Sequence, residues 1–157
     1  MKTERDVRAA STRRGDDDEQ RPSAVLLRAA ATRGVKVSLM VADWNTGAPS
    51  IAYLKSLALI PNVEIRIVSF PQLADGFIPY ARVLHSKFME IDGQVAWIGT
   101  SNWTGGYLDK SRNIEAILRD PGFAAQLTAL HDDLWNSNYA SPLDVSKTYP
   151  TPHPGQP

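Results

Sequence analysis

The sequence predicts an α/β domain in which helices flank a mixed β-sheet. Two helical patterns alternate with two strand patterns, a pair of apolar runs joined by a tight turn follows, and a last helical pattern comes near the end. The chain has 157 residues, 43% of them hydrophobic and 22% charged, which is ordinary for one soluble globular domain.

The first part of this pattern reads as helix, strand, helix and strand. A proline suits the first turn of a helix over residues 22–33, and Gly34 can end it. Apolar residues then alternate over 35–41, which predicts a strand. A second helix is expected over 49–60 and a second strand over 63–67.

The second part contains a predicted hairpin. Its apolar runs, 82–91 and 94–100, are joined by Asp92 and Gly93, the residue pair that best suits a type I′ turn. A further strand is expected over 112–118. The last helix is expected to begin at Pro121 and to carry an apolar stripe made of Phe123, Leu127, Leu130 and Leu134.

Both ends of the chain differ in composition from the middle. Residues 1–21 are dense in charge and poor in large apolar side chains, so we expect a flexible lead. Residues 143–157 are rich in proline, which predicts a flexible tail. The folded domain is therefore expected to span 22–142, and it contains no internal repeat.

Charge and composition exclude several classes. Seventeen basic and seventeen acidic residues give a net charge of zero, which argues against binding nucleic acid or membranes through overall charge. The absence of cysteine excludes disulfides and thiolate metal sites. No segment is apolar enough to span a bilayer or to act as a secretory signal, so we expect a soluble, untargeted chain. The compartment is left open, and would be an endomembrane lumen if a signal lies upstream of Met1.

One group of polar residues gathers around the hairpin. His85 and Lys87 are two apart, so on a strand both side chains would leave the same face. Asp92 follows in the turn, and the return run ends with Gly99, Thr100, Ser101 and Asn102. An imidazole that works near neutral pH, together with fixed donors for phosphate oxygens, is what phosphoryl transfer needs.

These residues resemble the HKD signature of the phospholipase D superfamily, H-x-K-x4-D-x6-G-S-x-N, with Thr100 where serine is usual. Asn113 and Glu115 match the N-x-E that commonly follows it. The residues 99–104 are similar to the second half of the lysosomal and viral envelope branch, whose members include 5′ exonucleases of single-stranded nucleic acid. The resemblance covers about residues 23–140 and implies one half-domain of such an enzyme.

The resemblance implies a phosphodiesterase that works without a metal or another cofactor. One histidine attacks phosphorus and forms a phosphohistidine, while a second histidine protonates the leaving oxygen and later activates water. By this analogy His85 is one of the pair, and Lys87 and Asn102 hold phosphate oxygens with support from the hydroxyls of Thr100 and Ser101. Glu115 would orient an imidazole. The implied catalytic set is His85, Lys87, Asp92 and Glu115.

Only one HKD motif is present, because His131 and His153 lack the required spacing. A complete site therefore needs a second copy of the chain, or another HKD-bearing half, placed about a twofold axis. Single-stranded nucleic acid is the preferred substrate by resemblance, and phospholipid is the second. The alternative is a non-catalytic remnant or fragment of a two-motif protein that acts as an interaction module.

Several of these residues also have structural interpretations. Asp92 is explained equally by the hairpin turn, and the hydroxyls of Thr100 and Ser101 could satisfy loop backbone groups. Asn113 is interpreted as a structural hydrogen-bonding residue. These alternatives stay open at this point.

Glu115 stands in an apolar segment, so a cationic partner such as an imidazolium is expected. His131 lies beside the apolar stripe of the last helix and is expected to face water. Three aromatic residues could stack on a substrate, although packing in the core or rim is favoured: Tyr80, Trp103 and Tyr107.

Overall fold

The computed structural model describes residues 5–11, 21–71, 73–74, 76, 78, 81–103 and 110–150. Their strands form one seven-stranded sheet in the order β6-β5-β4-β1-β2-β3-β7. The strands are β1 (Asp6–Ser11), β2 (Lys36–Ala42), β3 (Val63–Val68), β4 (Phe88–Ile91), β5 (Val95–Gly99), β6 (Glu115–Leu118) and β7 (Ala140–Pro142). The helices are α1 (Arg21–Thr32), the 3₁₀ helix η1 (Asp43–Thr46), α2 (Ser50–Ala58) and α4 (Pro121–Trp135).

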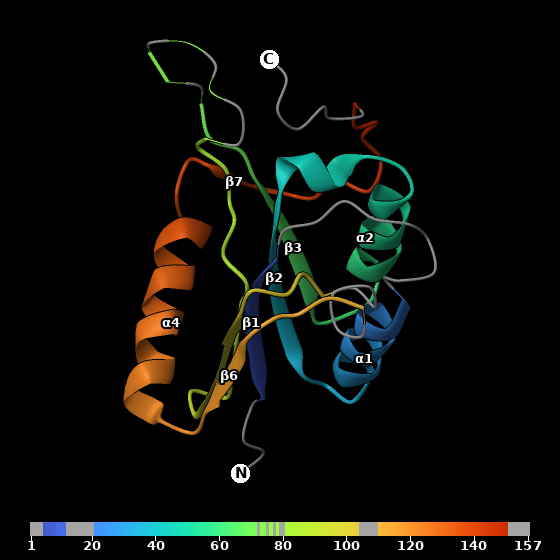
Figure 1. The fold of residues 1–157 in the computed structure, drawn as a ribbon. Coiled ribbons are helices and arrows are strands. Elements are labelled where there is room, and N and C mark those ends of the chain that lie inside the picture. Colours follow the sequence, from blue (N-terminus) through green and yellow to red (C-terminus); the bar gives the residue numbers. More distant parts are fainter. Residues whose placement is uncertain are drawn as a thin grey trace.

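The sheet is mixed and lies between helices, as predicted. Strands β1, β2 and β3 are parallel, while β4, β5, β6 and β7 each run antiparallel to a neighbour. Helix α4 packs on one face, over β1, β4 and β5. Helices α1 and α2 pack on the other face, over β2 and β3 (Figure 1). On this second face, none of the described helices covers β4, β5 or β6.

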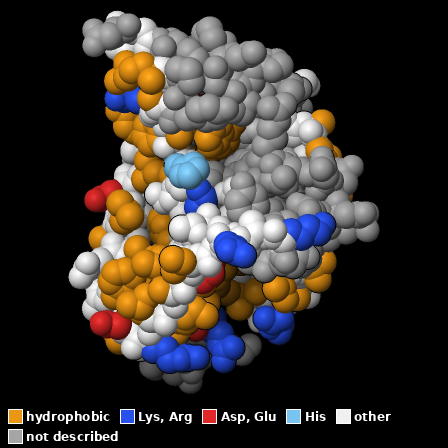
Figure 2. Space-filling model, viewed as in Figure 1, with side chains coloured by type: hydrophobic (Ala, Val, Ile, Leu, Met, Phe, Trp, Pro, Cys, Tyr) orange, Lys and Arg blue, Asp and Glu red, His pale blue; other side chains and the backbone are white. Residues whose placement is uncertain are grey.

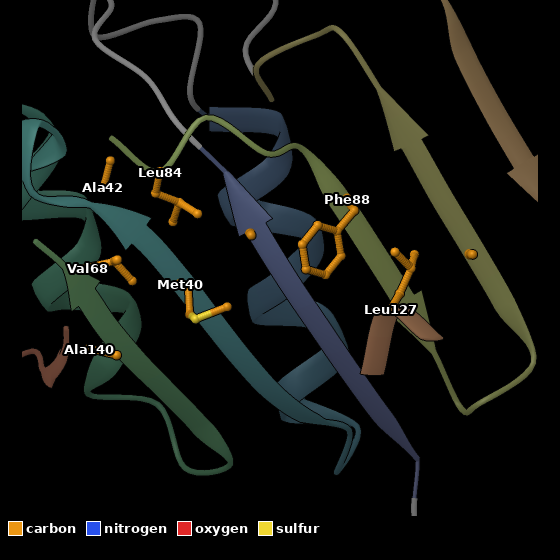
Figure 3. Packing of buried hydrophobic residues seen from close by; sticks show 9 residues of the cluster. Met40, Ala42, Val68, Leu84, Phe88, Leu127 and Ala140 are labelled. Atoms are coloured by element: carbon orange, nitrogen blue, oxygen red, sulfur yellow. The ribbon is translucent and has the colours of Figure 1, made fainter. Parts of the chain in front are cut away.

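The core on the α4 side joins the parallel and antiparallel parts of the sheet. Met40 of β2, Phe88 of β4 and Leu127 of α4 are buried in one cluster, together with Leu84, which precedes β4. Figure 3 shows Phe88 and Leu127 side by side, with Met40 on the neighbouring part of the sheet. Burial of each large apolar side chain contributes roughly 1.5 to 3 kcal/mol, so this cluster anchors the segment that leads into β4.

The predicted hairpin turn is confirmed. Asp92 and Gly93 both have positive φ, 57° and 66°, and the amide of Gln94 donates to the carbonyl of Ile91 at 3.0 Å. These are the features of a two-residue type I′ turn. The Asp92 side chain accepts a hydrogen bond from the amide of Asp6 at 2.8 Å, so it also ties the turn to the start of β1.

The expectation of a flexible lead over 1–21 is wrong for residues 6–11. They form β1, which lies between β2 and β4 in the middle of the sheet. The apolar residues of β1 that the structure describes are Val7, Ala9 and Ala10, which are all buried. Two of them are alanines, too small to give a clear strand pattern, so β1 is stabilised mainly by pairing on both sides. Residues 1–4 and 12–20 lie outside the described residues.

A charged network on the α4 side ties β1 to the hairpin. The Arg8 guanidinium contacts Asp6 at 2.7 Å, Asp132 of α4 at 3.3 Å and Glu90 of β4 at 3.4 Å. Glu90 is fully buried and also accepts a hydrogen bond from the amide of Gly93. A buried carboxylate without such partners would be strongly destabilising, so this network holds β1, β4 and α4 in one arrangement.

The flexible tail was also expected to begin too early. The amide of Leu143 donates to the carbonyl of Ile65 at 2.9 Å, and the side chains of Leu143 and Tyr149 pack on the core of the α1 side. The Tyr149 hydroxyl accepts from the amide of Asp144 at 2.9 Å. Prolines prevent regular secondary structure here but not packing, so the ordered chain continues at least to residue 150. Residues 151–157 lie outside the described residues.

The apolar stripe of the last helix is confirmed at Phe123, Leu127 and Leu134, which pack on the core, but the prediction is wrong at two positions. Leu130, assigned to the apolar stripe, is 54% exposed, whereas His131, expected to face water, is only 1% exposed. The His131 ring stacks on Trp135 with centroids 5.0 Å apart, and its Nδ1 lies 3.1 Å from the Asp132 carboxylate. Burial lowers the pKa of His131 below its ordinary value of 6.5, although Asp132 acts in the opposite direction.

The buried His131 should make folding stability depend on pH. Its pKa is lowered in the folded state, so the unfolded chain takes up the proton first as the pH falls. Stability from neutral His131 is therefore present above pH 6.5 and lost below it. We expect the free energy of unfolding, measured with denaturant, to fall between pH 7.5 and 5 more steeply in the wild type than in His131→Gln. The two slopes should differ by up to about 1.4 kcal/mol per pH unit. Equal slopes in the two proteins would contradict this prediction.

Candidate active site

The candidate site lies at one edge of the sheet. Strand β4 runs antiparallel to β1, with Phe88 opposite Ala10, so β4 begins where the parallel strands end. His85 and Lys87 precede Phe88 and were expected on the strand itself, but β4 begins only after them. Lys87 is still aligned with the sheet, because the amide of Gly99 donates to its carbonyl at 3.1 Å. The carboxyl edge of parallel strands is the usual ligand-binding edge of α/β sheets.

The imidazole and the ammonium group are in direct contact. Lys87 Nζ lies 3.0 Å from His85 Nε2 and donates to the His85 carbonyl oxygen at 2.8 Å. An ammonium group can only donate, so neutral His85 presents the lone pair of Nε2 to it and carries its proton on Nδ1. Lys87 is 8% exposed, whereas His85 is exposed. The contact therefore selects the tautomer in which Nε2 is a nucleophile.

Both groups are shifted toward their neutral forms. Burial lowers the pKa of His85 below 6.5, and the positive charge of Lys87 lowers it further. Burial also lowers the pKa of Lys87. His85 is exposed at the surface, and Figure 2 shows a histidine on this face of the molecule with a basic side chain below it. The imidazole is thus neutral at physiological pH and open to a substrate.

Glu115 reaches the same row of the sheet by lying across Gly99. The two residues are direct partners in the β5–β6 pairing, and Gly99 is also bonded to Lys87. A Cβ at position 99 would collide with the Glu115 carboxylate, whose Cδ would be 2.6 Å away. Gly99 thus provides the space in which the carboxylate lies.

The expected cationic partner of Glu115 is not found among the described residues. The Glu115 side chain is exposed, and no ion pair joins it to another residue in the part of the chain that the structure describes. An exposed carboxylate has no buried charge to compensate, which removes the physical reason for that expectation.

Thr100 and Asn113 form a clamp between the ends of β5 and β6. The Thr100 hydroxyl donates to Asn113 Oδ1 at 2.9 Å and accepts from the amide of Ile114 at 3.2 Å, and the Asn113 amide group donates to Ser111 at 2.7 Å. The structural interpretation of Asn113 is confirmed. Thr100 is engaged in the same clamp, so phosphate binding by its hydroxyl would have to replace these bonds.

We call the polar group formed by His85, Lys87, Gly99 and Glu115 the half-site. Ser101 and Asn102, which follow Gly99 closely in the chain, are both buried. The Ser101 hydroxyl is 1% exposed and has no hydrogen-bond partner among the described residues. Asn102 is also buried, and the ring of the following residue, Trp103, packs on the core of the α1 side and meets Trp97 edge to face at 5.8 Å. The packing interpretation of Trp103 is confirmed. Tyr80 and Tyr107 lie outside the described residues.

Asp92 does not join the other motif residues. It lies in the turn beyond the far end of β4, seven residues from His85 and therefore roughly 20 Å away along an extended chain. Its carboxylate accepts a hydrogen bond from the amide of Asp6, so the structure places Asp92 in the turn and away from His85. The described residues contain no cluster of three or more histidines and carboxylates that could hold a metal, and no helix long and apolar enough to cross a membrane.

Comparisons with known proteins agree with the motif. The family described as cardiolipin synthase, PLD-like domain, matches residues 18–135. A probable phospholipase D of Caenorhabditis elegans is 33% identical over 130 residues, which cover 74% of this chain and 23% of the relative. The human 5′-3′ exonuclease PLD3 is 35% identical over 132 residues, covering 77% of this chain and 27% of the relative. The chain spans about a quarter of the length of these curated relatives.

Solved structures show the same fold at low sequence identity. NucT from Helicobacter pylori superposes with a TM-score of 0.73 at 17% identity, covering 88% of this chain and 82% of NucT. The phospholipase D family member Nuc from Salmonella typhimurium has a TM-score of 0.66 at 22% identity and is covered to 81%. With the motif at the sheet edge, the family match over most of the chain and this shared fold, the protein belongs to the phospholipase D-like family.

Proposed function

We propose that the chain hydrolyses phosphodiesters through a phosphohistidine, at a site that two chains build together. The observation that carries the proposal is the contact between Lys87 Nζ and His85 Nε2, because it presents a nucleophilic nitrogen beside a cationic donor. Lys87 is well placed to turn from the imidazole to a phosphate oxygen. Membership of the family supports phosphodiester hydrolysis as the reaction class.

In the proposed first step, the lone pair of His85 Nε2 forms a bond to phosphorus and the ester P–O bond breaks. The leaving oxygen takes a proton from His85 of the second copy. In the second step, water attacks phosphorus, gives its proton to that second imidazole, and the N–P bond breaks. Dividing the reaction in this way lets one imidazole act as nucleophile while the other acts as acid and then as base.

The second imidazole must carry a proton, although the pKa of His85 is lowered in the single chain. A bound phosphate is negatively charged and raises the pKa of the imidazole that approaches it without bonding to phosphorus. The same residue can therefore serve in both roles, with the substrate creating the difference. Asn102 and the buried hydroxyl of Ser101 are proposed to complete the cradle for the phosphate oxygens.

Single-stranded nucleic acid is our first proposed substrate, on the motif resemblance and on the likeness to the human 5′-3′ exonuclease. Phospholipid is the second, because other relatives are named phospholipase D. Both are phosphodiesters, so the proposed chemistry is the same for either.

Removing the imidazole should abolish turnover without unfolding the protein. We expect His85→Ala to lower hydrolysis of a single-stranded oligonucleotide in EDTA by at least about a thousandfold, because the nucleophile is lost. His85 is exposed, so thermal unfolding should change little. His131→Gln, which alters a histidine far from the motif in sequence, should retain activity at pH 7.5. A wild-type chain without turnover on nucleic acid or phospholipid would favour the non-catalytic alternative.

Mixed dimers should show that two imidazoles are needed. When wild-type and His85→Ala chains are co-expressed in equal amounts, random pairing leaves about a quarter of the dimers with both imidazoles. We therefore expect activity per dimer of about a quarter of the wild-type value. A value of about one half would mean that each chain acts alone.

The charge of Lys87 should be visible in the titration of His85. Lys87→Met removes the positive charge that disfavours the imidazolium, so the pKa of His85 should rise. NMR titration of the imidazole signals measures this directly. Lys147→Met, which removes an exposed lysine elsewhere, is the matched control and should leave the pKa of His85 unchanged. An unchanged value in Lys87→Met would contradict the proposed contact.

Gly99 is proposed as a positioning residue that acts through Glu115. Gly99→Ala should displace the carboxylate and lower activity by about a hundredfold, the usual order for misplacing a catalytic group by about 1 Å. If the whole effect passes through Glu115, the double variant Gly99→Ala with Glu115→Ala should be no less active than Glu115→Ala alone. Multiplied losses in the double variant would show that Gly99 acts in another way.

A further inference from the structure

An apolar shelf lies beside the half-site, on the α1 side of the sheet. Its floor is the cross-strand row Met89, Trp97 and Ile117, which the pairing of β4, β5 and β6 places side by side. Leu26 and Leu27 of α1 form a wall, and the hollow between them has a volume of about 520 Å³. Trp103 and Arg119 also line it. We call this surface the shelf.

Large aliphatic side chains of the shelf and its border are exposed to solvent. Ile117 is 68% exposed and Leu26 69%, and Val25 beside Leu26 on α1 is exposed as well. Single exposed leucines are common, but a hollow lined almost wholly by apolar groups and bordered by exposed aliphatic residues is typical of a surface that binds another molecule. Arg119 is the one charged residue among the described residues that line it.

The shelf is continuous with the half-site. Lys87, Gly99 and Glu115 form one cross-strand row, and Met89, Trp97 and Ile117 form the next row on the same face. Rows on one face are about 7 Å apart along a strand. A partner that brings a second imidazole to the phosphate beside Lys87 must therefore also cover at least the first part of the shelf.

We propose that the shelf is the surface on which a second copy of this chain docks about a twofold axis. The inference rests on the proposed function, because the need for a second imidazole is what selects the partner. In this arrangement α1 of each copy, with Val25 and Leu26, lies over the shelf of the other, where β4, β5 and β6 carry no described helix. The interface is then isologous: each copy offers the same helix and the same shelf.

Charge and chemistry fit a second copy. The chain has no net charge, so two copies do not repel each other. The shelf is apolar at its centre and the half-site is polar at its border, which is the usual division between the core and the rim of an interface. A nucleic acid strand would place phosphates on apolar side chains, which is unfavourable, so the shelf itself does not suit that substrate.

The test is the oligomeric state of the 157-residue chain, measured by sedimentation velocity over a concentration series. Ile117→Lys places a charge at the centre of the shelf and should weaken dimerisation by at least about a hundredfold. Leu130→Lys is the matched control, since Leu130 is a similarly exposed aliphatic residue on α4, on the opposite face of the sheet. It should leave the dimer intact. Circular dichroism should show that both variants are folded, because both side chains are exposed.

The outcomes separate this inference from the proposed function. A wild-type chain that stays monomeric up to about 100 µM, at the weak end of specific association, would overturn the inference. A dimer that persists in Ile117→Lys would also overturn the inference. If that dimer hydrolyses phosphodiesters, the proposed function would still stand. A dimer that Ile117→Lys separates but that hydrolyses no phosphodiester would support the docking surface and contradict the function. Dissociation by Leu130→Lys would place the interface elsewhere.

Discussion

The register of the β4–β5–β6 pairing is the constraint on which the site depends. The Asp92-Gly93 turn aligns Met89 with Trp97, and continuing the same ladder brings Lys87 to Gly99 and Gly99 to Glu115. A slip of one residue would turn every side chain of a strand to the opposite face. The ammonium, the space above Gly99 and the carboxylate share one row only in this register. The Thr100–Asn113 clamp holds the open end of the same ladder, opposite the turn.

At the turn end of the β4–β5 pairing, hydrogen bonds and ion pairs fix the strands to their neighbours. Asp92 accepts from the amide of Asp6, and Arg8 joins β1 to Glu90 and to Asp132 of α4. These groups lie at the far end of β4 from His85, so they do not act on substrate. Their effect is to fix β4 against β1, and hence the position at which the segment carrying His85 and Lys87 leaves the sheet. The turn and the bond to Asp6 therefore give Asp92 a structural role in the motif.

Features encoded by local pattern could be predicted from the sequence. The alternation of helices and strands, the type I′ turn and the motif spacing all depend on neighbours in the chain. Features created by distant contacts could not. Strand β1 has small apolar residues and is stabilised by β2 and β4, and the burial of His131 depends on its packing against Trp135 and Asp132. The placement of the Glu115 carboxylate over Gly99 requires the β5–β6 register, which no spacing reveals, although a glycine at a strand end was a signal of close approach.

One face of the sheet carries a polar row of residues directly beside an apolar row. Its first row is polar and carries the proposed half of a phosphodiester site, and its next row is apolar and partly exposed. The chain covers about a quarter of its curated relatives but about four fifths of NucT and Nuc. If the site needs a second imidazole, as proposed, the half-domain has to bury surface next to His85, and apolar side chains there make that burial favourable. The position of the shelf one row from Lys87 would then make assembly and completion of the site a single event, so that an unpaired chain has neither.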